Sequence, residues 1–181
     1  MIPLGCVTGR FQPIHQQHLG LFDIALEACT HLIIAVTNPD TEARHREPGS
    51  AHRHTARANP FSYFERARLI TAALREHGVA ERCTLVPFDL ARKNIWPQYV
   101  PLNARHFVRA YGEWEREKAR RLEHAGYAVT LLEGDAANRV SASEIRASLR
   151  AGDGAWQALV PAATRPVLEQ MMVELPMDAR S

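Results

Sequence analysis

Residues 1–18 read MIPLGCVTGRFQPIHQQH, and this stretch decides the fold. The apolar run over residues 2–8 predicts a buried strand, Gly9 follows it, and apolar residues at helical spacing predict a helix over residues 19–29. A strand that passes through a glycine into a helix offers backbone N–H groups and the positive end of the helix dipole to an anion. We therefore expect an α/β protein with an anion site at the end of its first strand.

The alternation of apolar runs and amphipathic segments continues along the chain. Further strands are expected at residues 31–37, 83–87, 106–111 and 128–132, further helices at 63–77 and 114–125, and a helical C-terminal tail at 141–150, 153–159 and 161–174. Gly78 and Gly126 follow the two central helices, at the place where a left-handed residue commonly ends a helix. The pattern predicts an α/β fold with a doubly wound, Rossmann-like parallel sheet.

Composition limits the class of protein. The 181 residues are 46% hydrophobic and 23% charged, which is typical of a globular protein, and we expect a single domain over residues 1–181. A net charge of +2 is too close to balance for a surface that binds nucleic acid or an anionic membrane. Three cysteines without C-x-x-C spacing, no basic leader and no apolar run of roughly 18 residues favour a cytoplasmic protein. The oligomeric state, a homo-oligomer included, stays open.

One segment interrupts the alternation. Residues 38–59 hold four arginines, three histidines and two prolines between the second strand and the second long helix. This length is unusual for an α/β connection, so we interpret the segment as an inserted loop that is either functional or mobile. Its histidines, His45, His52 and His54, lack the spacing and the carboxylate or thiolate partners of a metal site, so no protein-held metal is expected.

Two histidines and an arginine give the end of the first strand its chemistry. The residues GRFQ at 9–12 lead to His15 and His18, which are three residues apart and therefore face the same side of a helical turn. Both imidazoles can donate to neighbouring phosphate oxygens, and Arg10 adds a forked donor. Each histidine alone is typical of a cap or a surface residue, but in this order the residues predict a phosphate site.

A second candidate segment, VSASEIR at residues 140–146, opens a helix after the last strand. Ser141 is typical of a helix cap and matches a capping box with Glu144, so these two residues alone require no ligand. Arg146 follows Ser143 by three residues, so its guanidinium can join a hydroxyl and free N–H groups around one anion. The segment therefore predicts a second set of phosphate donors.

Together the two segments resemble a known family. GRFQPIHQQH and VSASEIR are similar to the H-x-G-H and I-S-S-T-x-I-R signatures of the nucleotidylyltransferase superfamily, which has the cytidylyltransferase-like α/β fold. The residues NPFS at 59–62, with Glu65 and Arg66, look most like the archaeal-type nicotinamide mononucleotide adenylyltransferases. The similarity covers residues 2–170, and the two signatures together are specific.

The resemblance implies an activity. It implies transfer of a nucleoside monophosphate from a triphosphate, ATP being favoured, to a small phosphate acceptor such as nicotinamide mononucleotide, with release of pyrophosphate and a role in NAD biosynthesis. It implies Mg²⁺ that arrives with the nucleotide and no covalent enzyme intermediate. Catalytic roles fall to His15, His18 and Arg146. The implied nucleotide-binding residues are Gly9, Arg10, Phe11, Gln12, Gln17, Ser141 and Ser143.

The acceptor side matches the family only in part. Residues 89–96, DLARKNIW, resemble a D-x-x-x-N-x-x-W stretch whose tryptophan stacks on the acceptor ring, which implies acceptor contacts by Lys93, Asn94 and Trp96. Lys93 stands at the family's asparagine position, and Gln17 stands where the family has glycine. These departures motivate an alternative, a CTP-dependent cytidylyltransferase that activates a small phosphate or phosphonate. Ordinary core packing is the alternative for Trp96.

A third interpretation belongs to another class, a nucleotide-binding regulator on the same fold. A regulator would be expected to carry a broken catalytic signature, whereas both histidines and Arg146 are present. One further departure concerns the inserted loop, because the family's arginine before the NPF element falls on Ala58. We expect Arg53 or Arg57 to supply the missing charge.

Overall fold

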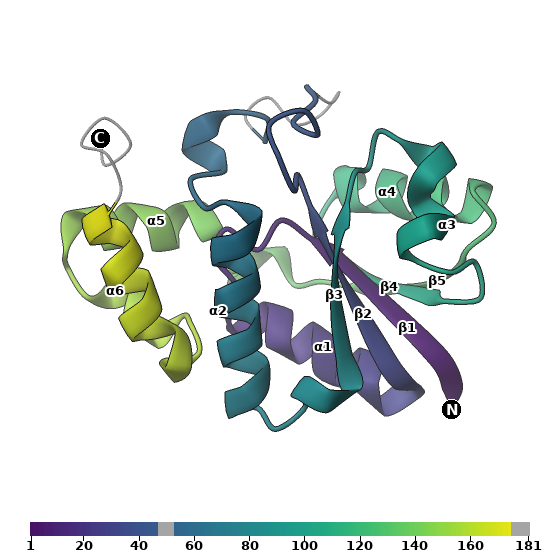
Figure 1. Ribbon diagram of the computed structural model, residues 1–181, viewed down its shortest axis with the longest axis horizontal. Coiled ribbons are helices and arrows are strands. Elements are labelled where there is room, and N and C mark those ends of the chain that lie inside the picture. Colours follow the sequence, from purple (N-terminus) through teal and green to yellow (C-terminus); the bar gives the residue numbers. More distant parts are fainter. Residues whose placement is uncertain (47–52, 175–181) are drawn as a thin grey trace.

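The structure is a computed structural model that describes residues 1–46 and 53–174 of the chain. Five strands form one parallel sheet in the order β3-β2-β1-β4-β5 (Figure 1). These strands are β1 (Ile2–Gly9), β2 (Cys29–Thr37), β3 (Cys83–Phe88), β4 (Arg105–Ala110) and β5 (Ala128–Glu133). Each lies within two residues of its expected bounds, and the reversal of order between β1 and β4 confirms the doubly wound sheet.

Helices cover both faces of the sheet (Figure 1). One face carries α1 (Gln16–Ala28) and α2 (Tyr63–Glu76), with α5 (Ala142–Ala151) and α6 (Arg165–Glu174) beyond them, and the other carries α3 (Trp96–Tyr99) and α4 (Glu113–His124). Gly78 and Gly126 adopt the left-handed conformation expected of them, with φ of 73° and 94°. The helix expected over residues 153–159 is wrong, because Gly152 and Gly154 both have positive φ and leave only a 3₁₀ turn at Ala155–Ala158.

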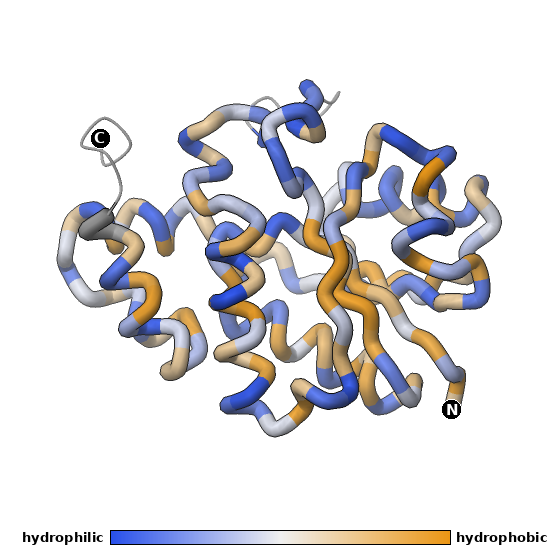
Figure 2. The backbone as a smooth tube through the Cα atoms, in the orientation of Figure 1, coloured by the Kyte–Doolittle hydropathy of each residue, from blue (hydrophilic) through white to orange (hydrophobic). Residues whose placement is uncertain are grey.

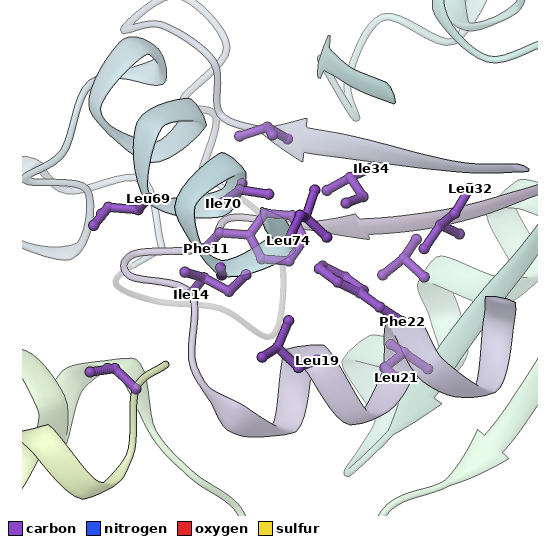
Figure 3. Packing of buried hydrophobic residues seen from close by; sticks show 14 of the residues in the cluster. Phe11, Ile14, Leu19, Leu21, Phe22, Leu32, Ile34, Leu69, Ile70 and Leu74 are labelled. Atoms are coloured by element: carbon purple, nitrogen blue, oxygen red, sulfur yellow. The ribbon is translucent and has the colours of Figure 1, made fainter. Parts of the chain in front are cut away.

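Apolar side chains of the strands alternate between two core layers. Along β2, Leu32, Ile34 and Val36 pack on the side of α1 and α2, whereas Ile33 and Ala35 pack on the side of α3 and α4. The strands therefore form the most hydrophobic part of the molecule in Figure 2. Figure 3 shows the larger layer, in which Leu19 and Phe22 of α1 meet Ile70 and Leu74 of α2 beneath the sheet.

The two neighbours of β1 are paired with it to different extents. β1 pairs with β2 from Ile2 to Gly9, but with β4 only at Gly5 and Cys6. The carboxyl ends of β1 and β4 are therefore not held together by a backbone ladder. In doubly wound sheets a ligand binds in the crevice at this reversal point.

The inserted loop is described in two pieces, residues 38–46 and 53–59. A 3₁₀ turn spans Ala56–Ala58, and the Thr55 hydroxyl accepts a hydrogen bond from the Ala58 N–H. His52, one of the three loop histidines, lies outside the described residues. Within the described residues no group of three or more side chains of the metal-ligating types is clustered, and no helix is long and apolar enough to cross a membrane.

Candidate active site

A cavity of about 1270 Å³ opens at the carboxyl ends of β1 and β4, where the strand order reverses. Residues from the first turns of α1, α4 and α5 line it, so the positive ends of three helix dipoles lie at its wall. The residues of the predicted site that line the cavity are Gly9, Arg10, Phe11, Gln12, His15, Gln17, His18, Ser141 and Ser143. Four predicted residues do not line it, namely Lys93, Asn94, Trp96 and Arg146.

His15 and His18 form a stacked pair at the start of α1. Their ring centroids lie 3.7 Å apart, and the backbone N–H of His15 donates to Nδ1 of His18 over 3.2 Å. Because Nδ1 of His18 accepts this bond, the ring proton belongs on Nε2, which becomes a hydrogen-bond donor. Burial and the neighbouring His15 hold the pKa of His18 well below its usual range, and burial and Arg139 lower the pKa of His15 to about 4. Both rings are therefore neutral donors at pH 7.

The loop after β1 fits closely around Gly9. A Cβ atom at Gly9 would lie 2.7 Å from the ring of Phe11, which itself packs edge-on against His18 with centroids 4.8 Å apart. The glycine is therefore needed because an aromatic ring lies on it. The side-chain amide of Gln12 bonds the backbone of Phe61 twice, donating to its carbonyl over 2.8 Å and accepting from its N–H over 3.0 Å. Phe11 and Gln12 thus shape the wall of the cavity rather than offering free donors.

Arginine side chains crowd the same wall. Arg10 donates from Nη1 to the carbonyl of Ala58 over 3.2 Å, and burial together with Arg53 and other arginines lowers its pKa to about 9. Arg53 of the inserted loop and Arg139 of the loop before α5 both reach Glu115, at 3.6 Å and 3.2 Å. One carboxylate therefore orients two arginines, one from each side of the cavity. Burial is the larger cause of this lowered pKa, and the neighbouring arginines add to it.

A buried arginine on α2 holds the ends of the strands in place. Arg66 is 1% exposed and donates to the carbonyls of Arg10, Thr37 and Asn38 over 2.8, 2.7 and 2.7 Å. Burial lowers its pKa to about 10. One guanidinium thus fixes the carboxyl ends of β1 and β2. Through its bond to the Arg10 carbonyl, Arg66 also holds the backbone of Arg10 in place.

Gln17 occupies the family's glycine position and joins two distant segments. Its Nε2 donates to the carbonyl of Asn138 over 2.6 Å, and its Oε1 accepts from the N–H of Val140 over 2.8 Å and from the Tyr111 hydroxyl over 3.1 Å. The side chain therefore ties the start of α1 to the loop before α5. This link explains why a long side chain stands at position 17, because a glycine could not reach Asn138 and Val140.

Ser141 caps the start of α5, but not with the expected capping box. The Ser141 hydroxyl accepts from the N–H of Ser143 over 3.2 Å, whereas the capping box forms at the start of α2, between Ser62 and Glu65. Ser143 in turn accepts from Nη2 of Arg146 over 3.1 Å. The box expected with Glu144 is wrong, because Ser141 bonds the second N–H of the helix rather than the third.

Arg146 lies behind the cavity rather than in it. The residue is 5% exposed, and its Nη1 donates to the carbonyl of Gln12 over 2.6 Å. Burial and the nearby Arg150 lower its pKa to about 10. In this structure Arg146 connects the first signature to Ser143 of the second, so the prediction that its guanidinium faces the triphosphate directly does not fit the geometry.

The predicted acceptor residues lie away from the cavity. The Trp96 ring is 1% exposed, stacks on Phe88 with centroids 5.3 Å apart, and donates from Nε1 to the carbonyl of Asp89 over 2.7 Å. Lys93 and Asn94 are exposed on the 3₁₀ turn before it. Packing against Phe88 and Tyr127 encloses the indole, so core packing accounts for Trp96 in this structure, and its stacking on an acceptor ring stays a prediction.

Several cavity residues were not expected from the motifs. Trp114, Glu115 and Lys118 of α4 line the cavity, and Arg53 lies over the Trp114 ring at 3.7 Å. Arg53 had been expected to add charge, whereas the α4 residues appear in the sequence as an ordinary charged helix face. The available signal was the position of Trp114, two residues after Gly112, in the first turn of the helix that follows a strand.

Comparison with known proteins identifies the family. The cytidylyltransferase-like family matches residues 6–148, which include both signature segments. The chain belongs to the cytidylyltransferase-like family. A phosphonoformate cytidylyltransferase from Streptomyces viridochromogenes is 32% identical over 171 residues, covering 94% of this chain and 92% of that protein. A nicotinamide-nucleotide adenylyltransferase from Pyrococcus horikoshii is 29% identical over 158 residues, covering 87% of this chain and 77% of that protein.

Solved structures agree on the fold. A bifunctional NMN adenylyltransferase/ADP ribose pyrophosphatase from Francisella tularensis superposes with a TM-score of 0.68 at 18% identity. The superposition covers 96% of this chain and 50% of the Francisella chain. A second structure with that description is complexed with AMP and a manganese ion. The cytidylyltransferase-like fold and family expected from the two signatures are confirmed, and relatives of both expected kinds, an adenylyltransferase and a cytidylyltransferase, are found.

Proposed function

We propose that this protein transfers a nucleotidyl group from a nucleoside triphosphate to a small phosphate-type acceptor and releases pyrophosphate. One observation carries the proposal. Arg10 lies at the end of β1 among other arginines, beside two neutral histidines, in a cavity at the reversal point of the sheet. Donors and positive charge in excess of the local carboxylates suit a polyanion such as a triphosphate.

The transfer requires two anions to be brought together. An acceptor oxygen forms a bond to the α-phosphorus on one side, while the bond from that phosphorus to the bridging oxygen of the β-phosphate breaks on the other. The bond electrons leave with pyrophosphate. A phosphate or phosphonate acceptor is already ionised at pH 7, so no general base is needed. The protein contributes alignment of the reactants and stabilisation of the negative charge.

The cavity residues supply these two contributions. In the proposal, Nε2 of His18 donates to a non-bridging oxygen of the α-phosphate, where charge gathers as the bonds change. The first N–H groups of α5, with Ser143, receive the β- and γ-phosphates. Arg10 and Arg139 complete the triphosphate contacts, while Gln12 and Arg146 keep the two signature segments in register. His15 stacks on His18 and keeps its ring in place.

Mg²⁺ fits this site only as an ion carried by the nucleotide. Among the described residues, the carboxylates lining the cavity are Glu113, Glu115 and Glu117, and all three are engaged by arginines. The remaining side-chain donors are mainly nitrogens, which suit phosphate oxygens rather than a hard cation. When bound to the triphosphate, Mg²⁺ would neutralise part of its charge.

ATP and nicotinamide mononucleotide are the first substrate pair that we assign. The support is the match of the NPFS segment with Glu65 and Arg66 to the archaeal-type enzymes and the similarity to the Pyrococcus horikoshii adenylyltransferase. The NPFS segment has a defined role in the fold. Its Phe61 backbone receives Gln12, and its Ser62 caps α2.

A second pair, CTP and a small phosphonate, is favoured by two other observations. The relative that is 32% identical over nearly the whole chain is a phosphonoformate cytidylyltransferase. In addition, Trp96 is enclosed in the core and offers no open ring face to a nicotinamide. This candidate shares every step of the chemistry above and differs only in base and acceptor.

The experiment is a substrate matrix with purified protein. ATP, CTP, GTP and UTP are each combined with nicotinamide mononucleotide, nicotinic acid mononucleotide and phosphonoformate in the presence of Mg²⁺. Pyrophosphate release is measured, and the product is identified by mass. Acceptor-dependent release with ATP and nicotinamide mononucleotide supports the first pair, and release with CTP and phosphonoformate supports the second. No acceptor-dependent release in any combination would contradict the proposed function. The cytoplasmic location stays a prediction.

A further inference from the structure

The hydroxyl of Thr8 is a buried donor that the fold does not use. Thr8 lies one residue before the end of β1, is 7% exposed and lines the cavity. Its Oγ1 has no hydrogen-bond partner among the residues that the structure describes. A buried hydroxyl without a partner is destabilising, and native structures rarely keep one without a reason. The position of Thr8, at the edge of a cavity for anions, gives such a reason.

A lysine from the other side of the sheet reaches the same point. Lys118 projects from the second turn of α4, lines the cavity, and donates from Nζ to the carbonyl of Thr8 over 3.4 Å. The ammonium therefore lies at the carboxyl end of the central strand. The chain has only two lysines, and the other, Lys93, is exposed away from the cavity.

The ammonium is also close to the histidine that we assign to the α-phosphate. The charge of Lys118 contributes to holding the pKa of His18 below its usual range, as do His15 and Arg109. His18 comes from α1, on one face of the sheet, and Lys118 comes from α4, on the opposite face. His18 and Lys118 thus line the same cavity from helices on opposite faces of the sheet.

We propose that Thr8 and Lys118 form the subsite for the attacking oxyanion of the acceptor, a phosphate or phosphonate group. The inference rests on the proposed function and deepens it. In-line displacement places the attacking oxygen opposite the pyrophosphate that leaves, and α1 and α5 already supply the donors for the triphosphate. The ammonium pairs with the acceptor anion and the hydroxyl donates to one of its oxygens. The new bond joins that anion to the α-phosphorus, and pyrophosphate departs with the electron pair.

The subsite gives the acceptor anion a position other than the acceptor residues predicted from the sequence. From the sequence, Lys93 was expected to suit a small anionic acceptor. The proposal keeps a lysine for this role but assigns it to Lys118. The subsite recognises the oxyanion common to nicotinamide mononucleotide and to a phosphonate. The rest of the acceptor lies beyond it, near Trp114, whose ring Arg53 covers at 3.7 Å.

Two variants test the subsite, Lys118→Met and Thr8→Val. For each, KM for the triphosphate and KM for the acceptor are measured separately with the active pair from the substrate matrix. We expect at least a tenfold rise in acceptor KM for Lys118→Met, a smaller rise for Thr8→Val, and a triphosphate KM within about twofold of the unchanged protein. Arg116→Met is the control, because Arg116 lies on the same helix, pairs with Glu133 and does not line the cavity.

Thr8→Val separates a ligand contact from a structural role. The change replaces an unpartnered buried hydroxyl with a methyl group of the same shape, so the melting temperature should stay equal or rise while acceptor KM rises. Equal rises in both KM values, a rise in triphosphate KM alone, or unchanged acceptor KM in Lys118→Met would overturn the subsite. A larger acceptor effect for Lys93→Met than for Lys118→Met would overturn it as well.

A binding measurement keeps the subsite distinct from the overall function. Phosphonoformate and nicotinamide mononucleotide are titrated by calorimetry into the protein saturated with a non-hydrolysable triphosphate. Loss of this binding in Lys118→Met, and its retention in Arg116→Met, supports the subsite whether or not the unchanged protein turns over. Equal binding to both variants, or no acceptor binding to the unchanged protein, overturns it. Absence of pyrophosphate release with every pair would contradict the proposed function alone.

Discussion

The side-chain oxygen of Gln17, in the first turn of α1, accepts a hydrogen bond from the backbone N–H of Val140 over 2.8 Å. Val140 begins the second signature segment, so one side chain joins the two segments that define the site. The same amide donates to the carbonyl of Asn138 over 2.6 Å. Gln17 therefore sets the distance between the two groups of phosphate donors.

Replacing Gln17 with glycine tests this role. The change removes three hydrogen bonds and places a flexible residue in a helix, which we expect to lower the free energy of unfolding by about 2 kcal/mol and the melting temperature by about 4–8 °C. Triphosphate KM should rise because the segments separate. Gln16→Gly carries the same helix cost with one long bond, of 3.3 Å, and is the control. Equal stability of the two variants, or improved use of ATP by Gln17→Gly, would contradict the link.

His18 is expected to carry the largest single effect on chemistry. His18→Ala removes the Nε2 donor from the α-phosphate and should lower kcat/KM about a hundredfold, or about 3 kcal/mol, while the fold is retained. His18→Gln should recover part of the rate, because its Nε2 amide can donate from a similar position. His15→Ala should act more weakly. Steady-state kinetics and a melting curve for each variant are the measurements, and wild-type turnover in a folded His18→Ala protein would remove the assignment.

The fold could be predicted from the sequence because its strands are buried on both faces. A strand such as β2, with Leu32 to Val36 divided between two core layers, must be apolar at every position and so stands out in the chain. The glycines that end α2 and α4 are equally visible. The first signature is local, since Gly9, His15 and His18 lie within one strand-to-helix connection and face the cavity as expected.

The sequence indicates least about side chains whose direction depends on distant packing. Trp96 has the residue type of a stacking platform, but Phe88 and Tyr127 enclose its ring from other parts of the chain. Lys118 has the residue type of a solvent-exposed helix position, but the placement of α4 over the sheet brings its ammonium to Thr8. No local pattern records either arrangement, because both depend on contacts across the sheet.

Arg146 gives a test of direct contact against positioning. The structure places its guanidinium between the Gln12 carbonyl and the Ser143 hydroxyl, so Arg146→Lys should lose the second contact and lower the melting temperature without any ligand. Triphosphate KM should rise as a consequence. Arg150→Lys, one turn further along α5, should change neither quantity. Weaker triphosphate binding with an unchanged melting temperature would mean that Arg146 touches the triphosphate.

His106 predicts how stability depends on pH. The ring is fully buried on β4 beside Tyr127, neither ring nitrogen has a hydrogen-bond partner among the described residues, and burial, with a contribution from Lys118, lowers its pKa from 6.5 to about 3. Below pH 6.5 His106 therefore binds a proton in the unfolded chain but stays neutral in the folded protein. The stabilisation is complete above pH 6.5 and is lost as the pH falls from 6.5 towards 3, by about 1.4 kcal/mol per pH unit for this group. His15 and His18 act in the same direction.

In His106→Leu the melting temperature should fall less steeply between pH 6.5 and 4.5 than in the unchanged protein, and at pH 7.5 the variant should be no less stable because it removes two unpaired nitrogens. If the melting temperature instead falls equally steeply with pH in the two proteins, His106 takes up its proton as easily in the folded state as in the unfolded chain.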